Sequence, residues 1–250
     1  MTIHDCQLNG VSLSGIDTRI CVLDIQEDAP EMVRTVHPLS RGGQRVRQQR
    51  RSLTVRVQFA IHETVPSRRK AILQSIAAWA QPGGFLTVED RPGKRLPVIC
   101  TALPAMTSED WTTPLTLNFT TTHCPWWEAQ TPTTVSGSSA LTLTVPGSAD
   151  FTPVDAEITN TGSQPITLLS IQCGDSYMFF SGIDLPAGET LHLSTEDGVF
   201  SAKIGDESVL AQRSTTSDDL LLAPCGKACD LLVSTTGTIR AAFSARGRYA

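Results

Sequence analysis

The clearest pattern in this sequence is a strict alternation of apolar and polar residues between Leu53 and Ile61. Successive side chains of a β-strand point to opposite faces, so this period of two predicts a strand with one face on a core. A similar run at 115–119 predicts a second strand, and Asn9-Gly10 between two short apolar runs predicts an N-terminal hairpin. The apolar positions of the first strand are Leu53, Val55, Val57, Phe59 and Ile61.

One segment of the first half has helical periodicity instead. Between Ser67 and Gln81, apolar residues recur at spacings of three and four, which is typical of one face of an amphipathic helix. Pro66 precedes the run and Pro82-Gly83-Gly84 follows it, and these residue types start and stop helices. The first half of the chain is therefore predicted to be β-rich with a single helix.

The second half predicts strands only. Short apolar runs follow one another with turn signals at roughly ten-residue intervals, a spacing that favours a β-sandwich. The polar stretch between the two halves is typical of a linker. We therefore predict a mainly β protein with an N-terminal domain at 1–128, a linker at 129–138 and a C-terminal β-sandwich domain at 139–250.

Charge is distributed unevenly along the chain. Residues 1–125 hold 14 Lys and Arg against 11 Asp and Glu, whereas residues 126–250 hold 6 against 14. The densest basic segment, 41–51, has five arginines in eleven positions. It is interpreted as a solvated hairpin arm, a contact between protomers, or a nucleic-acid site; the net charge of −5 and the lack of interleaved aromatic residues disfavour the last. The candidates for a contact between protomers are Arg45, Arg47, Arg50, Arg51 and Arg56.

The sequence has no local arrangement typical of a catalytic, metal or cofactor site. Its seven cysteines are scattered, mostly in apolar runs, which indicates free buried thiols in a reducing cytoplasm. Cys225 and Cys229 form one close pair but lack the further ligands that zinc needs. Adjacent carboxylates such as Asp218-Asp219 or Glu196-Asp197 point to opposite faces of a strand, which is poor geometry for glycoside hydrolysis. We expect no catalytic residues, no metal and no cofactor.

Trp126-Trp127 leaves two interpretations open. The rings form an exposed aromatic contact for a sugar or a protein, or they pack at the base of the first domain where the chain leaves it. The N-terminus lacks a signal-like segment, and no apolar run reaches the ~18 residues of a membrane span. We expect a protein that is made in the cytoplasm and does not insert into a membrane.

The order of these features resembles the N-terminal domain of siphophage distal tail proteins. The hairpin is followed by Arg41-Gly42-Gly43, the strand ending Phe59-Ala60-Ile61-His62, the helix, and finally Cys124-Pro125-Trp126-Trp127-Glu128. The second half, with Ile158-Thr159-Asn160-Thr161-Gly162 and the run from Ser217 to Gly226, is similar to the galectin-like sandwich that follows in that family.

This resemblance implies a structural virion protein that is not an enzyme. It would form a ring, expected to be a homohexamer, at the distal end of a long non-contractile tail. The ring would join the tail tube protein to the tip hub or tail-associated lysin protein, with a fibre or receptor-binding protein as a further partner. The location implied is the tail tip of the virion, after synthesis in the host cytoplasm. The alternative is a carbohydrate- or receptor-binding protein of the tail tip, in which Trp126, Trp127 or Tyr177 would stack on a sugar ring.

Overall fold

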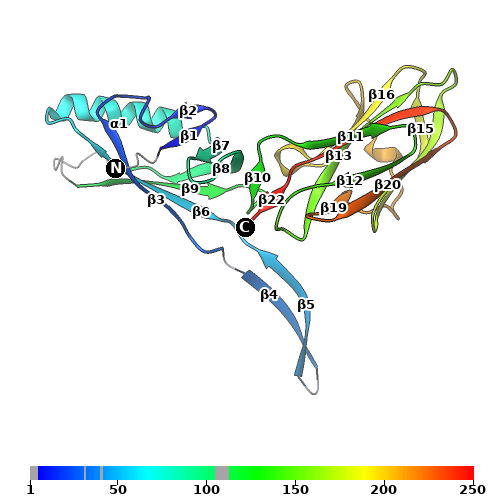
Figure 1. Ribbon diagram of the computed structural model, residues 1–250, viewed down its shortest axis with the longest axis horizontal. Coiled ribbons are helices and arrows are strands. Elements are labelled where there is room, and N and C mark those ends of the chain that lie inside the picture. The colour runs from blue at the N-terminus through cyan, green and yellow to red at the C-terminus, as the bar shows by residue number, and fades with distance from the viewer. Residues whose placement is uncertain (1–4, 31, 40–41, 105–112) are drawn as a thin grey trace. The chain divides into compact units, whose positions relative to one another are not determined.

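The computed structural model describes residues 5–30, 32–39, 42–104 and 113–250 (Figure 1). It divides into two compact units, Met1–Trp127 and Glu128–Ala250. Both units are built mainly of antiparallel strands, and the described residues contain one α-helix, so the predicted fold class is confirmed.

A single antiparallel sheet forms the framework of the first unit. It includes the pair of strands that the sequence predicted from alternation, and Val57, Phe59, Leu117 and Phe119 of these strands are fully buried. The sheet runs in the order β2 (Val11–Ser12), β1 (Cys6–Leu8), β7 (Gly84–Val88), β8 (Lys94–Ala102), β9 (Leu115–Thr121), β6 (Thr54–Ile61) and β3 (Ile20–Glu27).

Helix α1 (Pro66–Ala80) lies along one face of this sheet, as Figure 1 shows. Its buried residues include Ile72, Leu73 and Ile76, which share the helix face that the sequence predicted. Trp79 contacts Phe119 of the sheet edge to face, with the ring centroids 6.0 Å apart. The predicted helix is therefore confirmed. No helix among the described residues has the length and apolar character needed to cross a membrane.

The predicted N-terminal hairpin is also present. Asn9 and Gly10 both have positive φ, at 53° and 81°, as a two-residue turn requires. The Asn9 side chain donates to the carbonyl of Gly83 and accepts from the N–H of Phe85, both at 2.9 Å. Gly84 has a φ of 131°, and a Cβ there would lie 2.1 Å from Asn9 Oδ1, so glycine is favoured where the helix exit meets the hairpin.

A second hairpin, here called the arm, lies between β3 and β6 in the chain (Figure 1). It consists of β4 (Met32–Leu39) and β5 (Gly42–Arg50), which pair with each other and form a two-stranded sheet of their own. Residues 42–50 of the basic segment that the sequence singled out therefore form one strand of this arm.

The second unit is a β-sandwich with one continuous apolar core between its two sheets. Phe180 and Phe243 are the largest side chains of that core and are fully buried. One sheet runs β11 (Thr133–Gly137), β21 (Ile239–Ala245), β13 (Phe151–Asn160), β16 (Thr190–Ser194), β17 (Ser201–Ile204) and β18 (Glu207–Ser208), with β19 (Leu222–Pro224) on β13. The other runs β12 (Ala140–Thr144), β20 (Ala228–Thr235), β14 (Ile166–Cys173) and β15 (Ser176–Leu185).

The linker predicted at 129–138 is wrong. Thr133–Gly137 forms strand β11, which pairs with residues 241–245 of β21 at the edge of the sandwich. Upstream of it, the Arg246 guanidinium donates to the carbonyls of Ala129 and Gln130. The composition misled because an edge strand needs backbone pairing more than apolar side chains, so a run of Thr, Ser and Gly can form one.

Candidate assembly site at the root of the arm

The basic residues that the sequence singled out lie on the arm, directly after it, and on the strand β6 that follows. Arg45 and Arg47 belong to β5, opposite Val36 and Thr35 of β4, where the register shifts by one residue. Each strand of the arm has one edge that no described strand occupies. Such an edge presents unpaired backbone N–H and C=O groups and is a ready place for a strand of another chain.

Arg50, the last residue of β5, connects the arm to the rest of the first unit. Its guanidinium carbon lies 4.1 Å from the centre of the Trp126 ring, within range of a cation–π contact. Its Nε atom is buried without a hydrogen bond, so the aromatic face is its neighbour in place of an acceptor. Burial lowers the pKa of Arg50, and the negative charge of Glu27 opposes that shift.

Glu27 is the last residue of β3, just before the arm. Its Oε2 atom accepts a hydrogen bond from Trp127 Nε1 at 3.0 Å and forms an ion pair with Arg91 at 2.8 Å. The Arg91 guanidinium also lies 5.3 Å from the centre of the Trp127 ring. We call these five residues, Glu27, Arg50, Arg91, Trp126 and Trp127, the arm root. They tie both ends of the arm to the turn after β7 and to the end of the first unit.

The remaining candidates have different surroundings. Arg56 on β6 forms an ion pair of 2.9 Å with Asp28 of the same chain, so its charge is already partnered. Arg51 follows β5 and is exposed. Trp127 is only 1% exposed, so its ring is not open to a sugar from solvent. Of the aromatic residues weighed for sugar stacking, Tyr177 is the one with a side chain well exposed, at 40%.

The sheet of the first unit has two unlike edges. β2 has two residues, whereas β3 has eight and, among the described strands, pairs with β6 alone. Leu23 on this edge strand is 42% exposed. A long free edge next to a projecting arm is a surface on which another protein chain can continue the sheet.

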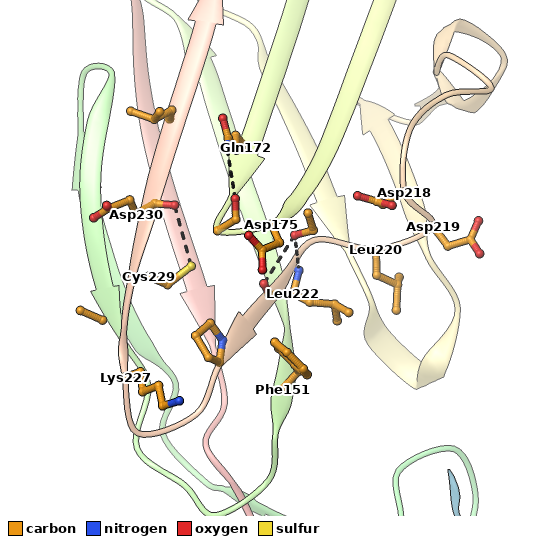
Figure 2. Close-up of a pocket in the computed structure, with 15 residues that line it drawn as sticks. Phe151, Gln172, Asp175, Asp218, Asp219, Leu220, Leu222, Lys227, Cys229 and Asp230 are labelled. Atoms are coloured by element: carbon orange, nitrogen blue, oxygen red, sulfur yellow. Dashed lines mark hydrogen bonds between the residues drawn. The ribbon is translucent and has the colours of Figure 1, made fainter. Parts of the chain in front are cut away.

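The second unit carries a groove with an acidic lining (Figure 2). Its volume is about 900 Å³, and Asp175, Asp218, Asp219 and Asp230 line it together with Lys227. The Asp218 carboxylate accepts the backbone N–H of Tyr177 at 2.7 Å, which gives it a structural role. Among the residues that the structure describes, no cluster of His, Cys, Asp and Glu is arranged to hold a metal ion.

The sequence analysis missed Glu27 and Arg91. No local signal could have revealed the contact between Glu27 and Trp127, because these two residues are 100 positions apart in the chain. The sequence did reveal the arginine-rich segment that contains Arg50 and the tryptophan pair that includes its contact, Trp126.

The fold of this chain is similar to solved structures of a phage adsorption hub protein and of a phage baseplate. The SPP1 Dit protein (gp 19.1), a paradigm of the hub adsorption apparatus in phages that infect Gram-positive bacteria, matches with a TM-score of 0.71 at 10% identity. The match covers 98% of this chain and 99% of that one. A chain of the phage P2 baseplate, in its activated conformation with calcium, matches with a TM-score of 0.51 at 6% identity over 98% of both chains.

These similarities are in structure alone. No family model and no curated protein matches the sequence. The fold implied by the resemblance to distal tail proteins is confirmed by the solved structures.

Proposed function

We propose that this chain is a structural protein of a phage tail tip, which assembles into a closed ring of six copies and has no enzymatic activity. The observation that carries the proposal is the full-length likeness to SPP1 Dit, which extends over both units and leaves almost no part of either chain unmatched. A likeness confined to the sandwich would have left many unrelated functions open, since sandwiches serve many of them.

The first unit has the features that ring formation needs. A ring requires a head-to-tail interface, in which one surface of a protomer meets a different surface of the next and the rotation closes. The free edge of β3 and the arm lie next to each other in the chain and supply one such surface. The arm root keeps Arg50 stacked on Trp126, so less conformational freedom is lost at the base of the arm when a neighbour binds.

Charge favours the same arrangement. The arm brings Arg45 and Arg47 toward a neighbouring chain, and each copy carries 14 Asp and Glu in residues 126–250 against 6 Lys and Arg. Arm arginines that meet acidic groups of the next protomer would steer association and fix its register. In the particle, the ring would join the tail tube protein to the tip hub or tail-associated lysin protein, and the second unit would be free to hold a fibre or receptor-binding protein.

The arm variants give a direct test of this interface. Sedimentation velocity would compare the wild type with the double charge reversal Arg45→Glu, Arg47→Glu. The matched control is Lys203→Glu, Arg240→Glu, which changes the net charge equally at two exposed positions of the second unit. We expect the arm variant to need at least about tenfold more protein to assemble, because like charges facing each other cost several kcal/mol. Assembly of the arm variant at wild-type concentrations would rule out the arm as the contact.

A truncated arm separates the contact from its charge. The pair Val33 and Gln49 lies opposite in the register of the arm, so an Asn-Gly turn can replace residues 34–48 and close the hairpin there. Trp126 and Arg50 remain in this variant. We expect a folded chain that stays monomeric, and rings formed by it would contradict the proposal.

A further inference from the structure

Two cysteines of the second unit have their sulfur atoms in contact. Cys173 Sγ and Cys229 Sγ are 3.5 Å apart, although the residues are 56 positions apart in the sequence. Cys173 ends β14, and Cys229 lies on the neighbouring antiparallel strand β20, two positions before the residue that pairs with Cys173. Both side chains point into the sandwich, with exposures of 0% and 2%. All seven cysteines lie in the described part of the chain.

The two thiols differ in access. Cys229 lines the acidic groove, where Figure 2 shows it beside Asp230. Cys173 is not among the residues that line the groove, and its sulfur is 3.4 Å from the carbonyl oxygen of Leu222. A small molecule that enters the groove therefore meets Cys229 before Cys173.

We propose that Cys173 and Cys229 are a redox-active pair that a peroxide converts to a disulfide, with Cys229 reacting first and Cys173 resolving. In the first step Cys229 sulfur attacks one peroxide oxygen: the S–O bond forms, the O–O bond breaks, and one water leaves as Cys229 becomes a sulfenic acid. In the second step Cys173 sulfur attacks that sulfur: the S–S bond forms, the S–O bond breaks and a second water leaves. The two thiols lose two electrons, and the peroxide gains them.

Geometry and burial favour this chemistry over exchange with a bulky disulfide. The sulfurs need to approach by about 1.5 Å to reach a bond of about 2.05 Å, which side-chain rotation and small strand movements can supply. Exchange would instead require a large reagent to line up with a nearly unexposed sulfur. Hydrogen peroxide is small and neutral, so it can enter where a peptide disulfide cannot.

Burial also affects the reactivity of both thiols. Burial raises the pKa of both thiols, and this slows oxidation because the thiolate is the reactive form. At Cys173 the contact with Cys229 raises the pKa further, whereas at Cys229 the contact with Cys173 lowers it against the effect of burial. The proposal is independent of ring formation, since both cysteines belong to one chain.

The test uses the full-length chain treated with hydrogen peroxide, blocked with iodoacetamide and digested without reduction. Mass spectrometry should find a peptide that joins Cys173 to Cys229, lighter than the two thiol peptides by two hydrogens and separated again by dithiothreitol. Cys6 is an internal control, since it is also fully buried, with a pKa raised to about 12, and lies in the other unit. We expect it to stay unlinked. Recovery of Cys173 and Cys229 unlinked, or linked elsewhere, would overturn the proposal.

Two variants test the assigned order. In Cys173→Ala the sulfenic acid of Cys229 has no resolving thiol, so peroxide followed by dimedone should label Cys229. In Cys229→Ala we expect at least about tenfold less label on Cys173, which the groove does not reach directly. Equal labelling in the two variants would refute the order, and the cross-link map of the wild type decides the pairing even if a variant folds poorly.

Discussion

Removal of the Glu27 carboxylate should destabilise the first unit and loosen the base of the arm. In Glu27→Ala, Trp127 loses the acceptor of its buried indole N–H, which is a bond to a charged group and contributes about 1.5–3 kcal/mol. The side chains of Arg91 and Glu27 are 28% and 25% exposed, so their ion pair contributes at most about 1 kcal/mol more. Water can enter the space left by the partly exposed carboxylate, so we expect a net loss of about 2 kcal/mol.

Tryptophan fluorescence is a selective assay for this loss, because all four tryptophans lie in the first unit. Urea unfolding followed by fluorescence should give a lower midpoint for Glu27→Ala, and a smaller shift for Glu27→Gln, whose amide oxygen can still accept from Trp127. Glu89→Ala is the matched control, since Glu89 is exposed and should change stability by less than about 0.5 kcal/mol. The reasoning fails if Glu27→Ala shifts the midpoint no more than this control does.

Two further predictions concern stability alone. Asn160 is fully buried, and its amide nitrogen donates to the carbonyls of Gln164 and Leu185. We expect Asn160→Ala to lower the free energy of unfolding by about 3 kcal/mol, measured by thermal unfolding with circular dichroism. A loss below about 1 kcal/mol would contradict this. Hydrogen bonds from Arg19 lower the pKa of Asp17 from 3.8 to about 2. A depressed carboxyl pKa contributes stability that is present above the unfolded pKa and lost as the pH falls through the folded one. The urea midpoint of the first unit should therefore fall between about pH 4 and pH 2. Arg19→Gln should flatten that dependence, and an unchanged pH profile in this variant would sink the assignment.

The features that could be predicted from the sequence are the ones that depend on local amphipathicity. The strand ending at Ile61 alternates because one of its faces is buried, and helix α1 has its apolar residues on one face for the same reason. Strand β3 was not predicted, since a bulge between Val22 and Asp24 breaks the parity that alternation relies on. Strand β11 was taken for linker because an edge strand of Thr, Ser and Gly carries little apolar signal.

The candidate site was predictable only in part. The basic segment and the tryptophan pair stand out locally, so both were found from composition. The contacts that join them are not local, because Arg50 meets Trp126 and Glu27 meets Trp127 only once the sheet has brought distant segments together. The contact between Cys173 and Cys229 is of the same kind, since it depends on the pairing of β14 with β20.

The solution mass of the purified full-length protein tests the central claim most directly. Light scattering on a size-exclusion column, with negative-stain images of the peak, gives both mass and shape. We predict a mass of about 161 kDa, for six chains of 26.9 kDa each, and images of open rings. A species of one chain at the highest concentration attainable, with no rings in the images, would contradict assembly of this chain into a ring by itself.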